Sequence, residues 1–229
     1  MRKSAICLLL IFLLTLSGCA GQDQQYSITH LTLFDTVTTI TGTAASQDEF
    51  QSEAKQIYDV LLEYHQLFDI YNDYEGLNNL KTVNENAGIA PVAVDRKIID
   101  LLQDCRTYYE QTDGTVNVAM GSVLQLWHEA RQAETAALPD AAALAQAALH
   151  CSWDTVVIDE SAGTVYLSDP QQRLDVGAIA KGWAAERVAE AAPSGYLLSL
   201  GANVVATGPK TQQGAPWVVG VTDPDGGAY

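Results

Sequence analysis

Residues 174–190 read LDVGAIAKGWAAERVAE, and the rest of the chain is organised around this stretch. Ala180, Ala184 and Val188 recur every four residues, which is the spacing of one face of a helix. Gly177, a few residues earlier, suits a tight turn. The stretch therefore predicts the end of a strand, a turn and an amphipathic helix.

Polar groups gather where the predicted helix begins. The first turn of a helix has unpaired N–H groups and a partial positive charge, so an anion can bind there. Lys181 in this turn indicates a phosphate-like ligand, because a lysine is unfavourable there unless an anion compensates it. Asp175 suits a ligand hydroxyl or amine, or a hard cation such as Mg²⁺. Alternatively, Asp175 caps the helix and Lys181 is a solvated surface charge.

Composition limits the classes of partner. The chain has 229 residues, of which 48% are hydrophobic, and this is enough for a sizeable core in one large or two small domains. Its formal net charge is −16, which argues against binding nucleic acid or anionic lipid through the surface. A ligand that carries phosphate therefore needs a local positive site or a metal.

The pattern LDxGxxAKGxAxxRVAE resembles the central motif of the ApbE-type FAD:protein FMN transferases, which are lipoproteins and periplasmic enzymes of bacteria. The resemblance runs from about residue 31 to the last residue. It implies an α+β fold of the ApbE or tunnelling-fold type, with antiparallel sheets packed against helices. It also implies that Asp175 orients FAD and that Lys181 holds its diphosphate.

The first residues predict a lipoprotein signal peptide at positions 1–18. Arg2 and Lys3 precede an apolar run that is too short to span a bilayer. The run ends in LSGC, which resembles the lipobox of bacterial lipoproteins. This resemblance implies that Cys19 is acylated, that residues 19–27 form a tether, and that the protein is extracytoplasmic and lipid-anchored to the bacterial cell membrane. An ordinary signal peptide with an incidental cysteine is the alternative.

Two segments match the flavin contacts of the family. The triplet at Phe34–Thr36 occupies the place of an MGT-like triplet, which implies that Phe34 lies against the isoalloxazine. A core strand residue is the alternative. Tyr71 lies in a segment that resembles FSxYxxxSExSxLN and matches a tyrosine that contacts FAD, although the serines of that pattern are missing.

A third segment, DGTVNVAMGSVLQLW, resembles the family's DGxFDPTVxPLVxLW. By this resemblance Thr115, Val116 and Asn117 contact the adenine and ribose end of FAD. Asn117 replaces an aspartate, but an amide can still bond an adenine edge through both donor and acceptor. Trp127, at the end of the segment, is interpreted as a core residue.

Hydrophobic periodicity predicts the remaining elements. The alanine-rich segment 130–150 is interpreted as packing, and His65 as structural or exposed. Cys105 and Cys151 could pair outside the cytoplasm, but their apolar surroundings favour two buried thiols. The predicted strands lie within 29–43, 154–168, 196–200, 203–207 and 217–221, and the predicted helices at 47–70, from Asp95 as cap to about 110, and from 138–140 onward.

The resemblance implies a reaction. The complete protein would cleave the FAD pyrophosphate and attach FMN through a phosphoester to a threonine of an extracytoplasmic acceptor protein, such as a membrane redox subunit, with Mg²⁺. In relatives the residue three after the motif aspartate gives a backbone carbonyl to the metal, which here is Ala178. An FAD-binding or scavenging lipoprotein and an FAD pyrophosphatase are the alternatives.

The family pattern continues beyond Tyr229. Its next segments, HIIDPxTG and DAxxT, carry a histidine that approaches the flavin and further Mg²⁺ ligands. Residues 28–229 are therefore interpreted as an incomplete flavin transferase domain, truncated at its C-terminal end.

Overall fold

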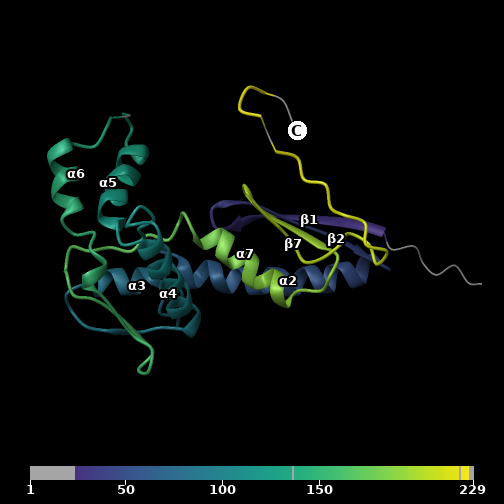
Figure 1. Cartoon of the computed structure of the whole chain (residues 1–229), viewed down its shortest axis with the longest axis horizontal. Coiled ribbons are helices and arrows are strands. Elements are labelled where there is room, and N and C mark those ends of the chain that lie inside the picture. Colours follow the sequence, from purple (N-terminus) through teal and green to yellow (C-terminus); the bar gives the residue numbers. More distant parts are fainter. Residues whose placement is uncertain (1–23, 136, 222, 227–229) are drawn as a thin grey trace, which may run out of the picture.

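The computed structural model describes residues 24–135, 137–221 and 223–226, so the predicted signal peptide and Cys19 lie outside the described residues. Antiparallel sheets pack against helices, as the sequence predicts (Figure 1). The strands are β1 (Gln24–Leu33), β2 (Thr36–Ala44), β3 (Val92–Ala93), β4 (Val156–Asp159), β5 (Thr164–Leu167), β6 (Tyr196–Leu200) and β7 (Asn203–Ala206). The helices are α2 (Gln47–Phe68), α3 (Leu80–Glu85), α4 (Arg96–Gln111), α5 (Gly121–Gln132), α6 (Ala141–Ala148) and α7 (Ala180–Ala191), with a short 3-10 helix at Trp153–Thr155.

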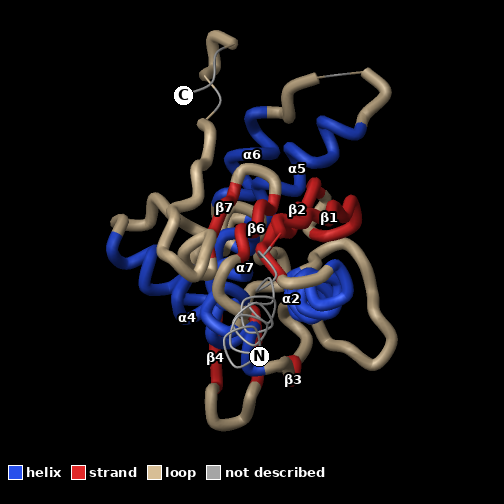
Figure 2. Tube along the Cα trace, turned by 90° about the vertical axis from the view of Figure 1, so that its right-hand side faces the viewer, coloured by secondary structure: helices blue, strands red, loops and turns tan. Residues whose placement is uncertain are grey.

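The larger sheet has the strand order β1-β2-β6-β7, and every neighbouring pair is antiparallel. Alternate residues of β2, among them Ile40 and Ala44, are buried, so one face of the sheet lies on the core. Helices α2 and α7 pack on this sheet and on each other. Figure 2 looks nearly along α2 and shows α7 beside it, with the strands above both. The start of α7 is therefore fixed between the sheet and the longest helix.

Aromatic rings join the two central helices. Trp183 of α7 lies with its ring edge-on to Tyr64 and to Phe68 of α2, at centroid distances of 5.5 and 5.6 Å. Its indole N–H donates to Oδ2 of Asp104 on α4 across 2.7 Å. Trp183 is 7% exposed and thus connects three helices at the base of α7.

The smaller sheet has the order β3-β5-β4, and the predicted hairpin around Gly163 is confirmed. It packs against α3, on the side of the molecule where α4 also lies (Figure 1). Among the described residues, no helix combines the length and the hydrophobicity needed to cross a bilayer.

Four local predictions are wrong. Trp127 is 39% exposed rather than in the core, and α6 has no buried residue, because α5 and α6 pack mainly on each other and project from the body (Figure 1). Residues 217–221 form no strand, and Val218 is 91% exposed, since this segment does not pair with a sheet. The residues before Leu174 are extended but form only a single bridge, between Met120 and Arg173.

The two described cysteines are free thiols. Cys105 is buried, and burial raises its pKa to about 12. Cys151 is only partly buried, because it follows α6 on the projecting part of the chain, and burial raises its pKa as well. The prediction of two buried thiols therefore holds for the first cysteine and only in part for the second.

Candidate functional site

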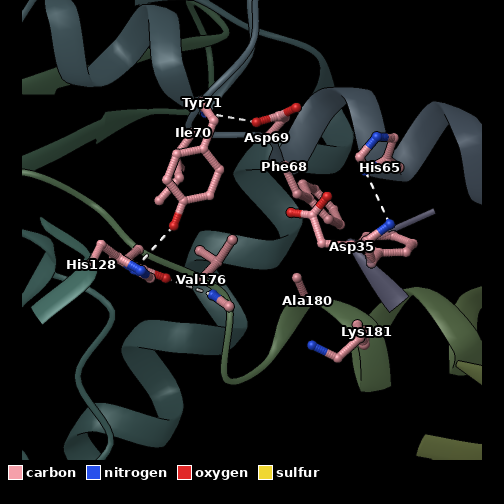
Figure 3. A pocket seen from close by; sticks show the side chains of 13 residues that line it. Asp35, His65, Phe68, Asp69, Ile70, Tyr71, His128, Val176, Ala180 and Lys181 are labelled. Carbon is pink, nitrogen blue, oxygen red and sulfur yellow. Dashed lines mark hydrogen bonds and ion pairs between the residues drawn. The ribbon is translucent and has the colours of Figure 1, made fainter. Parts of the chain in front are cut away.

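A cavity of about 310 Å³ opens at the start of α7. Figure 3 shows Tyr71 and His128 on one side of it and His65, Asp35 and Lys181 on the other. The walls come from the β1–β2 turn, the end of α2 with the loop after it, α5, and the segment that leads into α7. The lining residues are Phe34, Asp35, His65, Phe68, Asp69, Ile70, Tyr71, His128, Asp175, Val176, Gly177, Ala180 and Lys181.

The segment before α7 is held by single backbone hydrogen bonds and by one side-chain amide rather than by a sheet. Asp175 N–H donates to the carbonyl of Val118 across 2.8 Å. The buried amide of Asn84 bonds both the N–H and the carbonyl of Leu174, at 2.7 and 2.9 Å. Gly121 lies so close that a Cβ there would come within 2.6 Å of the Arg173 carbonyl oxygen. These contacts place Asp175 at the cavity wall.

The carboxylate of Asp175 is engaged on both oxygens. Oδ1 accepts from Gly177 N–H across 2.8 Å, and Oδ2 lies 3.2 Å from Nε2 of His128, which must donate because an ionised carboxylate only accepts. The residue before α7 is Ile179, and no side chain caps the helix. The alternative in which Asp175 caps α7 is therefore wrong. The first helical amide, Ala180 N–H, donates to the Val176 carbonyl across 2.8 Å. No side chain of the described residues caps the start of the helix.

Lys181 lies in the first turn of α7, as the sequence predicts. It is half-buried, and its ammonium group points into the cavity (Figure 3). Within the part of the chain that the structure describes, Lys181 forms no ion pair. Lys181 and the partial positive charge of the helix end lie next to each other. A bound anion would neutralise both.

Tyr71 stands on the opposite wall. Its hydroxyl lies 3.0 Å from Nε2 of His128, and Arg131 contacts the other ring nitrogen of that histidine. Burial, and next the negative charge of Asp175, raise the pKa of Tyr71, so its hydroxyl stays protonated. A second cavity of about 290 Å³ lies on the far side and shares the wall of Tyr71, His128 and Asp175.

Asp69 orients the loop that carries Tyr71. Its carboxylate accepts from the N–H groups of Tyr71 and Asn72, from the Asn72 amide and from the Tyr74 hydroxyl. Burial acts to raise the pKa of Asp69, but these hydrogen bonds together outweigh it, and the pKa lies below its ordinary value. Asp69 is therefore an ionised, fully bonded anchor.

We expect Asp69→Asn to lower the free energy of unfolding by about 1–3 kcal/mol at pH 7, because the amide leaves donors without an acceptor. A carboxylate whose pKa is lower in the folded than in the unfolded protein stabilises the fold at pH values above its unfolded pKa of about 3.9. This contribution to stability is lost as the pH falls through the folded-state pKa. The gap between wild type and variant should therefore narrow below about pH 4 in urea unfolding. Asp59→Asn, at an exposed pair with Lys55, is the control. A gap that is equal at pH 7 and pH 3 would contradict the role of Asp69.

The β1–β2 turn forms the remaining wall. Phe34 and Asp35 both have φ of 51°, the left-handed region that hairpin turns of two residues require. Phe34 lines the cavity and is partly buried against the core. It lies in the turn between β1 and β2, so the alternative of a core strand residue is wrong about the strand. Its contact with the isoalloxazine stays a prediction. Asp35 is exposed and forms no hydrogen bond or ion pair within the described residues.

The structure brings Phe34, Tyr71, Asp175 and Lys181 together around one cavity. Thr115, Val116 and Asn117 are not among its lining residues. The Asn117 amide donates to the Cys151 carbonyl and accepts from Ala119 N–H. It therefore fixes the loop in which the next residue, Val118, accepts from Asp175 N–H. The contact of these three residues with adenine stays a prediction.

Ala178, the predicted source of a metal-binding carbonyl, is exposed in the turn before α7. In residues 24–135, 137–221 and 223–226 no group of three or more His, Cys, Asp or Glu side chains is placed to hold a metal. Mg²⁺ takes about six oxygen ligands, so the described side chains do not by themselves fit this ion. Its binding to Ala178 stays a prediction.

Among the lining residues that sequence reasoning did not identify are His65, Asp69 and His128. His65 follows Leu61 by one helical turn on α2 and precedes Phe68 by another, so its place on the inner face of the helix was a usable signal. No comparable signal marked His128, because its partner Asp175 is 47 residues away.

Comparison with known proteins identifies consistent relatives. A family model described as the ApbE family matches residues 33–229. The chain is 28% identical to the FAD:protein FMN transferase of Treponema pallidum (strain Nichols), over 96% of this chain and 65% of that protein. It is 30% identical to that of Klebsiella pneumoniae (strain 342), over 69% of this chain and 50% of that protein. The chain thus spans about half to two thirds of the length of these relatives.

Two solved structures are similar in fold. The ApbE protein of Thermotoga maritima has a TM-score of 0.75 at 24% identity, covering 89% of this chain and 65% of that one. The flavin transferase ApbE of Vibrio cholerae has a TM-score of 0.74 at 19% identity, covering 91% and 67%. These likenesses confirm the predicted ApbE-type α+β fold.

Proposed function

The chain belongs to the ApbE family, and from this premise we propose that the complete protein is an FAD:protein FMN transferase. Its acceptor would be a threonine of a protein outside the cytoplasm, and its substrate FAD. The curated relatives carry the name of this activity. Since the chain covers only part of their length, the activity of the whole protein is the proposal.

The observation that carries the proposal is Lys181, which lies in the first turn of α7, and neither this lysine nor the start of the helix has a side-chain partner among the described residues. The diphosphate is the part of FAD that suits the start of α7, because its negative charge is attracted both to the Lys181 ammonium group and to the positive end of the helix. The aromatic rings of Phe34 and Tyr71 give the same cavity flat apolar surfaces for a planar ring system. The charge and the shape of the cavity thus both favour a dinucleotide that carries an aromatic ring system.

The reaction is a substitution at phosphorus. The hydroxyl oxygen of the acceptor threonine forms a bond to the phosphorus on the riboflavin side of FAD. The bond from that phosphorus to the bridging oxygen breaks, AMP leaves with this oxygen, and the proton of the hydroxyl is released to the solvent. Lys181 and the start of α7 would hold the negative charge that moves onto the phosphate oxygens. Asp175, fixed by Gly177 N–H and His128, would orient the nucleotide.

Dependence on Mg²⁺ is a separate part of the proposal. It rests on the family resemblance, because the described side chains do not form a metal site. The roles given to Lys181 and Asp175 do not require the ion.

The test is incubation of the full chain with FAD and an acceptor domain that contains the target threonine, with and without Mg²⁺. We expect FMN to become covalently attached to the acceptor, seen as a mass increase and in-gel flavin fluorescence, and AMP to be released. An acceptor whose threonine is replaced by alanine is the control. Release of FMN and AMP without labelling would instead identify a pyrophosphatase, and intact bound FAD would identify a storage protein.

A further inference from the structure

The β1–β2 turn lies in a conformation that its residues do not favour. Two-residue hairpin turns with positive φ at both positions prefer pairs such as Asn-Gly, because other side chains clash with their own backbone there. Here the pair is Phe34 and Asp35, both at φ 51°. An aromatic residue in the left-handed region persists only where its surroundings hold it. The turn also forms a wall of the cavity, so what holds it also shapes the site.

His65 of α2 is the side chain that holds the turn. Its Nδ1 accepts the hydrogen bond from Phe34 N–H across 3.2 Å. The Phe34 ring lies edge-on to the imidazole, with 5.5 Å between ring centroids. In Figure 3 this bond spans from α2 to the turn at the edge of the cavity. Since Nδ1 accepts, the ring hydrogen is assigned to Nε2.

The other ring nitrogen continues the contact to the opposite wall. Nε2 lies 3.4 Å from the Tyr74 hydroxyl, which donates to Oδ2 of Asp69 across 2.7 Å. Asp69 in turn accepts from Tyr71 N–H across 2.6 Å. One chain of hydrogen bonds therefore connects the Phe34 turn with the loop that carries Tyr71.

We propose that His65 is a positioning residue of this cavity, which holds the Phe34–Asp35 turn through its unprotonated Nδ1 so that both residues face the ligand. The inference rests on the proposed function only in using FAD as the ligand. It does not place His65 in contact with FAD.

Two substitutions separate the acceptor from the bulk of the ring. His65→Asn puts an amide oxygen near the position of Nδ1, where it accepts without titrating. His65→Leu keeps volume but has no acceptor. His30→Asn is the matched control, since His30 lies on β1 of the same hairpin and stacks on Tyr58, away from the turn.

Amide hydrogen exchange in the ligand-free protein tests the inference directly. At pH 7.5 the exchange of Phe34 N–H, corrected for its intrinsic rate, should be protected in wild type and roughly three- to tenfold less protected in His65→Leu. His65→Asn should retain most of the protection, and the control should behave like wild type. Equal protection of Phe34 N–H in wild type and His65→Leu would overturn the proposal. So would a loss of protection in His65→Asn, a comparison with wild type that remains if the leucine variant does not fold.

FAD affinity gives the functional readout. The dissociation constant, measured by quenching of flavin fluorescence at pH 7.5, should rise roughly three- to tenfold in His65→Leu and stay near wild type in His65→Asn. Unchanged affinity in His65→Leu would overturn the positioning role. Failure of wild type to bind FAD would contradict the proposed function instead, and the exchange measurement would still decide the role of His65.

Discussion

Replacing Lys181 by alanine should weaken FAD binding by roughly 10- to 100-fold, the usual loss when a charge-assisted hydrogen bond to a ligand is removed. The fold should not suffer. A lysine in the first turn opposes the helix dipole, so its removal should leave the free energy of unfolding equal to that of wild type or raise it by up to about 1 kcal/mol. Affinity and stability are thus expected to move in opposite directions. Flavin fluorescence titration and urea unfolding measure the two quantities.

Two variants separate this effect from a general change of charge. Lys55→Ala removes the same charge from an exposed pair on α2 and should leave FAD affinity unchanged. Lys181→Arg keeps the charge and should retain most of the affinity. If Lys181→Ala binds FAD as wild type does, Lys181 is a surface charge and the proposed phosphate site is wrong.

Replacing Trp183 by alanine should lower the free energy of unfolding by about 3–5 kcal/mol. The substitution removes the ring between Tyr64 and Phe68 and leaves a void that close-packed neighbours cannot fill. It also removes the donor to Asp104. Urea unfolding measured by circular dichroism gives the difference.

Trp127→Ala is the matched control, since it deletes the same side chain from a half-exposed position on α5. This substitution should lower the free energy of unfolding by no more than about 1 kcal/mol. If the alanine variant of Trp183 does not fold, Trp183→Phe, which keeps a ring but lacks the indole N–H, should still be less stable than wild type. Equal losses at the two tryptophans would contradict the central position of α7.

The start of α7 could be predicted from the sequence because its signals are local. Helical spacing within residues 174–190 and the electrostatics of a helix end depend on neighbours in the chain. The same reasoning predicted Lys181 in the first turn, α2, and the hairpin around Gly163.

The wrong predictions all concern long-range packing, namely which face of a helix is buried and whether a segment pairs with a neighbouring strand. Trp127 and His128 are neighbours on α5, yet the tryptophan is half-exposed and the histidine lines the cavity. Neighbouring helical residues point about 100° apart, and only the path of the chain around Asp175 decides which of them faces inward. The hydrogen bond between His65 and Phe34 joins residues that are 31 positions apart in the sequence, so no local pattern predicts it either.

The cavity is assembled from four stretches that are far apart in the chain: the turn at residues 34–35, the end of α2 with the loop after it, one residue of α5 and the entry to α7. No single stretch retains the site when the others separate, so the proposed flavin ligand would be recognised only by the fully folded protein. Ligand occupancy then adds to the cooperativity of folding: a ligand at 100 times its dissociation constant stabilises the native state by about 2.7 kcal/mol. The melting temperature would therefore report binding of the proposed ligand, and the ligand-free protein would be the form that is first lost to heat or proteolysis.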